Sequence, residues 1–156
     1  MFRKIIVGCI FIFFAYSSAY SQEYSNVIGI RAGLPTGLTY KRFFDENSAI
    51  EGILGTRWRG VSMSLLYEYH KETNLYPGLR WYFGGGAALG FYDNQSPWVV
   101  GDDYKAIFGV EVVVGIDYNF AEVPINLSFD WTPLYNIIGY TDFDLLQFAI
   151  SVRYMF

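Results

Sequence analysis

The chain has 156 residues, of which 53% are hydrophobic and 21% aromatic, and it carries a formal net charge of −4. This length suits a single domain, and no low-complexity or charged tract marks a linker. The acidic balance argues against nucleic acid as a partner. The single cysteine, Cys9, excludes an internal disulfide framework and a cysteine-based metal site.

The N-terminal segment has the pattern of a cleavable secretory signal. Arg3 and Lys4 give it a positive start, and an apolar stretch over residues 5–16 is followed by small residues. The apolar stretch is too short for a membrane-spanning helix, which needs roughly 20 residues. Cleavage fits after Ala19 or after Ser21, and we prefer the second position. We therefore predict a signal peptide over residues 1–21 and one domain over residues 22–156.

The rest of the chain is rich in apolar residues but contains no long apolar run. Charged residues interrupt every stretch after residue 22, so no segment has the length of a spanning helix. A closed β-barrel is the other structure that crosses a bilayer, because all of its backbone groups are paired within the wall. Its signature is an alternation of apolar and polar residues in segments of about ten.

Period-two patterning predicts eight strands in chain order. The expected strands are Val27–Leu34, Gly37–Phe44, Ser48–Trp58, Gly60–His70, Leu75–Tyr92, Ala106–Tyr118, Pro124–Thr132 and Leu146–Phe156. The last strand has the clearest pattern. In the fourth strand only Leu66 breaks the alternation. We predict an all-β fold: an eight-stranded antiparallel up-and-down transmembrane β-barrel preceded by a cleavable signal peptide.

An even number of strands places both chain ends on one side of the membrane. The connections on that side are expected at Asp45–Asn47, Lys71–Asn74 and Asn119–Val123. Those on the opposite, outer side are expected at Pro35–Gly37, Arg59-Gly60, Asp93–Tyr104 and Pro133–Asp142.

The C-terminal strand carries a pattern that is known from bacterial barrels. Its outward set, which ends in a terminal phenylalanine, resembles the C-terminal insertion signal of outer-membrane barrels: Phe148, Ile150, Val152, Tyr154 and Phe156. Segments such as Gly29-Ile30-Arg31-Ala32-Gly33 and Tyr82-Phe83-Gly84-Gly85-Gly86 add to this likeness. Residues 24–156 thus resemble the small eight-stranded outer-membrane protein β-barrel family of Gram-negative bacteria. The resemblance implies a location in the outer membrane, with outer-membrane lipids and the barrel-assembly machinery as partners, and it assigns no catalytic residue.

Charged residues on the polar faces of the strands are expected to point into the lumen. They are Arg31, Glu51, Arg57, Glu68, Arg80, Glu111, Asp117, Asp130 and Arg153. Side chains nearly fill the interior of an eight-stranded barrel, and buried charges persist only when they are paired. We therefore expect a charge network that plugs the lumen. A narrow passage or a small-ligand site is the alternative.

Other candidate sites are weaker. His70, the sole histidine, shares a face with Glu68 and with Ser62 and Ser64, which would suit a lipid hydrolase. However, the i,i+2 spacing separates Glu68 and His70 by about 6 to 7 Å, so the strand alone does not make them a hydrogen-bonded pair. Aspartates near the long outer connections could collect divalent cations: Asp93, Asp102, Asp103, Asp142 and Asp144. The glycines 84–86 lack the lysine and hydroxyl residue of a phosphate loop.

Taken from sequence, the leading hypothesis is a non-enzymatic integral outer-membrane barrel with a structural or surface-interaction role. It requires no catalytic residue, cofactor or metal. The alternatives are a narrow channel or conduit for small or apolar solutes, an outer-membrane lipid-modifying enzyme, and a soluble lipocalin-like barrel whose aromatic face turns inward around an apolar ligand.

Overall fold

The computed structural model of the chain describes residues 25–93, 96, 105–139 and 141–156. The predicted signal peptide, residues 1–21, lies outside this range, as do Asp102 and Asp103. The described residues form ten strands: β1 Asn26–Gly33, β2 Thr36–Phe43, β3 Ser48–Arg57, β4 Gly60–Glu72, β5 Leu79–Tyr92, β6 Lys105–Asn119, β7 Ile125–Trp131, β8 Leu134–Ile138, β9 Asp142–Asp144 and β10 Phe148–Met155. No helix within the described ranges is long and apolar enough to span a membrane.

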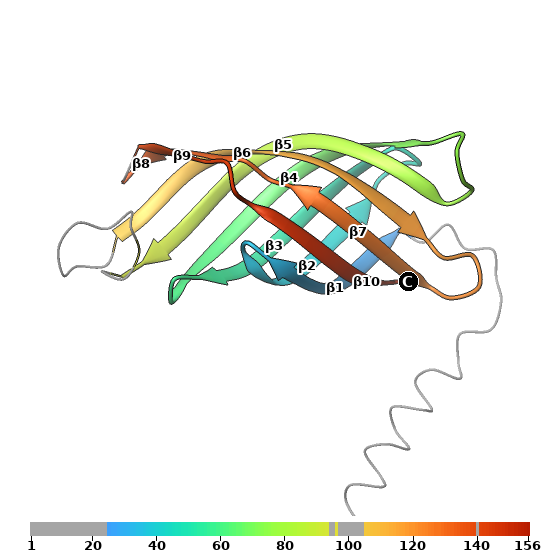
Figure 1. The fold of residues 1–156 in the computed structure, drawn as a ribbon, viewed down its shortest axis with the longest axis horizontal. Helices are drawn as coiled ribbons and strands as arrows, with labels where there is room; N and C mark the ends of the chain where they lie inside the picture. The colour runs from blue at the N-terminus through green and yellow to red at the C-terminus, as the bar shows by residue number, and fades with distance from the viewer. Residues whose placement is uncertain (1–24, 94–95, 97–104, 140) are drawn as a thin grey trace, which may run out of the picture.

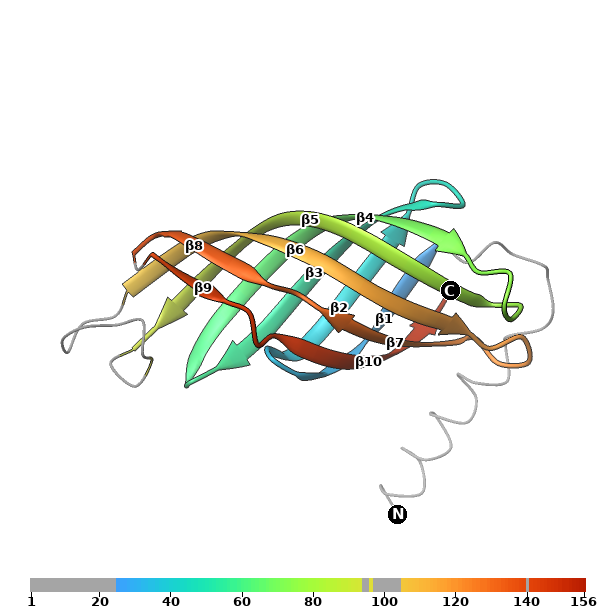
Figure 2. The ribbon, with the colours of Figure 1, turned by 45° about the horizontal axis from the view of Figure 1, so that its top comes forward.

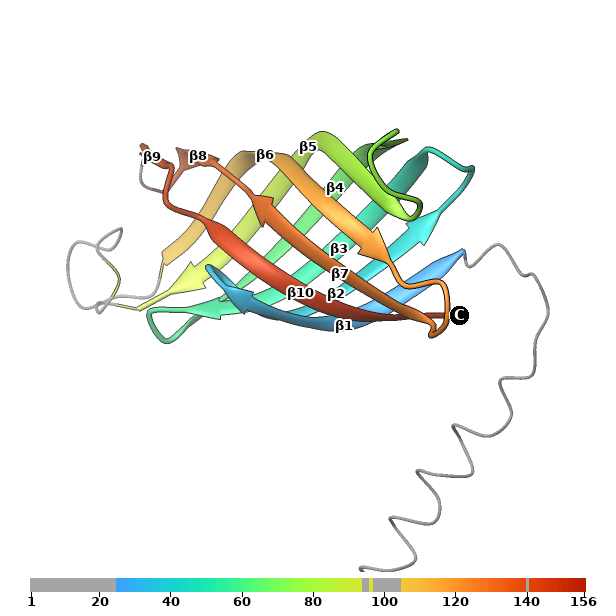
Figure 3. The ribbon, with the colours of Figure 1, turned by 45° about the vertical axis from the view of Figure 1, so that its right-hand side comes forward.

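The strands close into an antiparallel barrel (Figure 1). Each of β1 to β6 pairs with its neighbours in sequence, β7 pairs with β6, and β10 lies between β7 and β1. At the closing seam the backbone N–H groups of Asn26 and Phe156 donate to each other's carbonyl oxygens, at 3.1 and 2.8 Å. Both described chain ends therefore lie at the same end of the barrel (Figure 3), here called the terminal end. The opposite end is called the loop end.

At two of the eight positions in the wall, two consecutive strands take the place of one long strand. β7 and β8 follow each other along β6. On their other side, β10 pairs with β7 and β9 pairs with β8. The first break falls at Pro133, which has no N–H to donate to a ladder. The predicted eight-stranded barrel is confirmed. The predicted outer connection Pro133–Asp142 is wrong, because β8 and the start of β9 occupy most of it, and β5 begins at Leu79 rather than Leu75.

Side chains alternate between the two faces as the sequence pattern predicts. Along β4 every second residue is buried, and Leu66, which breaks the polar pattern, points inward against Ile53, Tyr82 and Val113. The outward positions are aliphatic or aromatic and exposed, for example Ile30, Leu65 and Val112. This arrangement is the opposite of the one that a soluble lipocalin-like barrel requires. An apolar outer belt around a polar interior is what a bilayer solvates.

The turns at the two ends are built differently. At the terminal end, the Asp45 carboxylate accepts hydrogen bonds from the backbone N–H groups of Asn47 and Ser48, at 2.8 and 2.7 Å, and these bonds lower the pKa of Asp45. At the loop end, Trp58 and Arg59 join β3 to β4 with φ angles of 48° and 60°. Positive φ at both central residues is typical of a type I′ hairpin, whose twist matches that of the strands. The tight turn was expected one residue later, at Arg59-Gly60.

The wall is uneven at the loop end. The β1–β2 hairpin stops short of the β3–β4 hairpin and of the β8–β9 hairpin (Figures 1 and 2). Arg57 at the end of β3 forms an ion pair with Asp144 of β9. This pair links the taller parts of the wall on either side of the short hairpin.

Candidate functional site: the polar interior of the barrel

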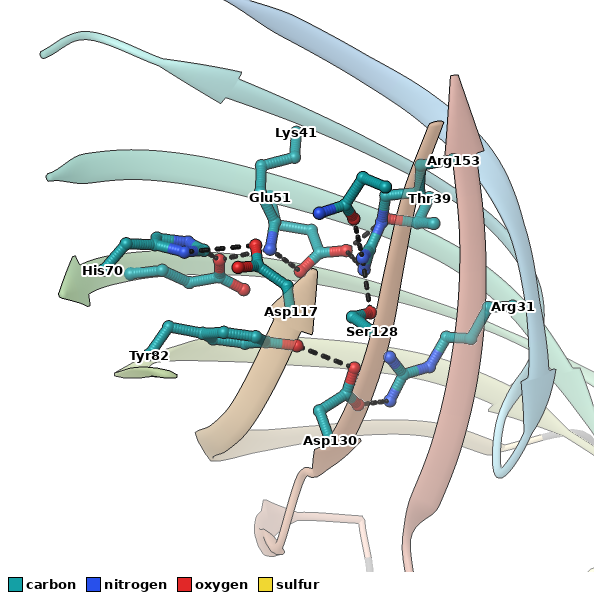
Figure 4. A network of polar contacts seen from close by, with 12 residues as sticks. Arg31, Thr39, Lys41, Glu51, His70, Tyr82, Asp117, Ser128, Asp130 and Arg153 are labelled. Carbon is teal, nitrogen blue, oxygen red and sulfur yellow. Dashed lines mark hydrogen bonds and ion pairs between the residues drawn. The ribbon is translucent and has the colours of Figure 1, made fainter. Parts of the chain in front are cut away.

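Glu51 on β3 is the centre of a buried network in the half of the lumen nearer the terminal end (Figure 4). Its carboxylate accepts a hydrogen bond from the Thr39 hydroxyl and pairs with Arg153 Nη2 at 2.5 Å and Lys41 Nζ at 3.4 Å. The side chains of Glu51, Lys41 and Arg153 are each 2% exposed or less. Strands β2, β3 and β10 are thus tied together across the lumen.

Arg153 uses its guanidinium in several directions. Nη1 donates to Ser128 Oγ at 2.5 Å and to Asn126 Oδ1 at 3.2 Å, and Nε donates to Thr39 at 3.4 Å. The planar fork of five N–H donors in arginine suits such a junction. Arg153 therefore joins β10 to β2, β3 and β7.

The network continues through Lys41, Glu68 and His70. Lys41 Nζ lies 2.6 Å from Glu68 Oε2, and the same oxygen lies 2.9 Å from His70 Nε2. The i,i+2 spacing alone did not predict this bond between Glu68 and His70, which forms through the rotamers of the two side chains. Lys41 was not among the charged residues that were predicted to point into the lumen. The outward Leu38 and Tyr40 beside it were a usable signal, since alternation then turns Lys41 inward.

Beyond His70 the network reaches the terminal end. His70 Nδ1 lies 3.4 Å from Asp117 Oδ2, and Arg80 donates to both oxygens of Asp117 at 3.1 and 3.0 Å. The His70 ring stacks on Tyr82, with 4.7 Å between centroids. The guanidinium of Arg80 lies over the Phe43 ring. Charged and aromatic side chains thus meet inside the lumen at this level.

A second cluster ties β1 to β7 and β5. Arg31 Nη2 lies 2.6 Å from Asp130 Oδ1 and donates to Thr132 Oγ1 at 3.3 Å. The Tyr82 hydroxyl donates to Asp130 Oδ2 at 3.0 Å (Figure 4). Tyr82 also stacks on His70, so this tyrosine connects the two clusters inside the lumen.

The remaining predicted lumen charges lie nearer the loop end. Arg57 pairs with Asp144, which also accepts a hydrogen bond from Gln147 at 3.0 Å. Glu111 on β6 is 2% exposed, and the hydroxyls of Ser64 and Thr132 lie beside its carboxylate. Asp144 had been expected in a cation-collecting loop cluster, but the structure places it against Arg57. Within the described part of the chain no group of acidic, histidine or cysteine side chains is arranged to hold a metal ion.

The serines proposed for a lipid hydrolase do not lie beside His70. Ser62 and Ser64 precede His70 on β4 by enough residues to place them about 20 Å or more away along the strand. The polar side-chain atoms that contact the His70 imidazole nitrogens in the described structure belong to Glu68 and Asp117. A Ser-His pair is therefore not formed by these residues.

The residues of the predicted C-terminal insertion signal lie on the outer surface. Its aromatic and aliphatic side chains on β10, and Phe156 after it, are exposed on the belt. The Phe148 ring stacks against those of Phe129 and Trp131 on β7, with centroids 6.2 Å apart in both pairs.

No protein-family model matches the chain, and no curated protein matches it. Among solved structures it is similar to the N-terminal β-barrel domain of Pseudomonas aeruginosa OprF, with 17% identity and a TM-score of 0.67, over 86% of this chain and 100% of that chain. It is also similar to Neisserial surface protein A, with 12% identity and a TM-score of 0.53, over 84% of this chain and 94% of that chain. At such identities the likeness concerns the fold alone. The chain has the eight-stranded fold of these outer-membrane barrels, and the predicted location in a Gram-negative outer membrane agrees with both neighbours.

Proposed function

We propose that the chain is a non-enzymatic integral barrel of the outer membrane, with a structural or surface-interaction role and a lumen closed by its charge network. The apolar outer belt supports membrane insertion, and the fold shared with OprF and Neisserial surface protein A supports the location. In this role the chain contacts other molecules through the outer surface of a closed wall rather than through an open pore.

The network between strands that are not neighbours in the wall is the observation that carries this proposal. Ion pairs run from β10 to β3, from β2 to β4 and from β1 to β7, so each side chain reaches past at least one intervening strand inside the lumen. The apolar cluster of Ile53, Leu66, Tyr82 and Val113 fills the space between them. A polar network of this kind holds its members in one arrangement when their hydrogen bonds are satisfied.

The shape of the interior supports closure at this level. A cavity of about 930 Å³ opens at the terminal end, where Phe43, Lys71 and Phe120 are among its lining residues, and it extends to Arg80. Arg80 is bound to Asp117, the outermost carboxylate of the network. The network therefore forms the floor of this cavity.

The first experiment is to refold residues 22–156 into detergent micelles and to compare gel mobility before and after boiling. A closed membrane barrel shifts on boiling and needs detergent to stay in solution. A protein that stays soluble without detergent would contradict the proposal.

Conductance in planar bilayers then tests the closed lumen. We expect no regular conductance steps from the wild-type barrel and an increased conductance from the double variant Glu51→Ala/Arg153→Ala. The matched control is Glu46→Ala/Lys71→Ala, which removes one charge of each sign outside the network. Steady steps from the wild-type protein would instead support the narrow channel, with the cavity at the terminal end as its entrance.

A further inference from the structure

Glu111 differs from the other buried carboxylates of the barrel in its partners. Glu51, Glu68, Asp117 and Asp130 each have a basic nitrogen within 3.0 Å. In the described part of the chain, no basic nitrogen lies within 4.0 Å of the Glu111 carboxylate, and its Oε2 accepts no hydrogen bond. Arg3 and Lys4, in the predicted signal peptide, are the basic residues outside that part. Lys105, the basic residue on the same strand, lies about 20 Å away along it.

The Glu111 side chain lines a small cavity, here called the Glu111 chamber. Its volume is about 20 Å³, and the residues that line it include Ser62, Ser64, Asn136 and Gln147. Asn136 is 1% exposed, and neither polar atom of its amide has a hydrogen-bond partner among the residues that the structure describes. Buried polar groups in this condition ordinarily bind a water molecule or an ion. About 10–15 Å³ is enough for one water-sized particle, so the chamber has room for one.

The charge balance of the chamber indicates the sign of its ligand. Arg57, which lines the chamber, is already matched because it pairs with Asp144, and Arg31 on β1 is matched because it pairs with Asp130. A buried carboxylate without a matching charge is costly, and it is relieved by a cation or by a proton. A divalent ion prefers six or more oxygen ligands and usually more than one carboxylate. One carboxylate, one amide oxygen and serine hydroxyls instead suit an ion with a single positive charge.

We propose that the Glu111 chamber is a binding site for one small monovalent cation, such as Na⁺, K⁺ or NH₄⁺. Glu111 Oε2 and Asn136 Oδ1 are its principal ligands, and the hydroxyls of Ser62 and Ser64 line the same space. The ion neutralises the carboxylate that lacks an ion pair. The Arg57–Asp144 pair at the loop end covers the chamber, so exchange of the ion requires this pair to open.

The test compares the unfolding of the refolded barrel in sodium, potassium and N-methyl-D-glucamine chloride at equal concentrations, because the last cation is too large for the chamber. We expect the wild-type barrel to be more stable with the small ions. At a free concentration about ten times the Kd, the unfolding equilibrium constant falls about tenfold. Glu111→Gln removes the charge at nearly constant volume and should abolish the difference between salts. Glu46→Gln, on the exposed turn at the terminal end, should retain it.

Diffraction from crystals grown with thallium(I) supplies a measurement that does not depend on stability. Anomalous density between Glu111 and Asn136, absent in Glu111→Gln, is the expected result. Equal unfolding of the wild-type protein in all three salts would overturn the proposal. So would an infrared band of a protonated carboxylic acid that disappears in Glu111→Gln, because a proton would then neutralise the group.

Discussion

Replacement of Arg153 by methionine tests the network at its most connected residue. The variant keeps a long side chain but removes hydrogen bonds to Glu51 and Ser128, both 2.5 Å, and weaker ones to Asn126 and Thr39. Glu51 then retains Lys41 at 3.4 Å as its basic partner. Removing one member of a buried ion pair costs about 3–5 kcal/mol, mainly because the other charge stays buried.

The assay is equilibrium unfolding by urea in phospholipid vesicles, followed by tryptophan fluorescence and by gel mobility without boiling. The expected loss corresponds to about two to three and a half orders of magnitude in the unfolding constant. Arg42→Met, at an exposed position on β2, is the matched control and should change stability little.

The double variant Glu51→Gln/Arg153→Met distinguishes pairing from packing. Without either charge, the site no longer buries an unmatched ion, so the double variant should be less destabilised than the sum of the two single variants. Coupling energies between such neighbours are about 0.5–3 kcal/mol. A loss below about 1 kcal/mol in Arg153→Met, or strict additivity in the double variant, would refute the reasoning.

Three further predictions concern the wall and its assembly. Leu66→Ala, at a position with 0% exposure inside the barrel, should cost about 2–5 kcal/mol in urea unfolding, whereas Leu65→Ala on the belt should cost much less. Gly84→Ala should cost about 1–3 kcal/mol in the same assay, because its Cβ would lie 2.0 Å from the carbonyl oxygen of Tyr67; Gly52→Ala should be tolerated, because its nearest neighbour would be 3.9 Å away. Phe156→Ser should lower the fraction of heat-modifiable barrel in cell outer membranes but not after refolding in detergent, if the C-terminal strand is the insertion signal that the sequence predicts; an equal loss in both assays would contradict that role.

The strands and their faces were predictable because each depends on residues close together in sequence. Alternation in the segment around Leu66 identified the inward face of β4, and the structure agrees. The strands β8 and β9 were not predicted, because Pro133 interrupts the alternating pattern at the end of β7. β8 nevertheless continues to pair with β6 beyond this break, so the wall extends further toward the loop end than the pattern indicated.

Contacts across the lumen were less predictable than the strands. The side chain that faces a given carboxylate depends on the stagger between distant strands, which no local pattern encodes. Alternation placed Glu68 and Glu111 on the same kind of face. It could not show that Lys41 reaches Glu68 while none of the described basic side chains pairs with Glu111. The bond between Glu68 and His70 likewise depends on side-chain rotamers rather than on spacing.

The seam between β1 and β10 has a consequence for the order in which the barrel forms. The chain's first described strand finds one of its two neighbours only when the last strand is available. The bonds of Arg31 to Thr132 and of Arg153 to Glu51 join residues 101 and 102 positions apart. Such non-local pairings slow folding, because long loops must close before any contact rewards them. A nascent chain emerging from its N-terminus thus cannot complete the cylinder until its last strand arrives.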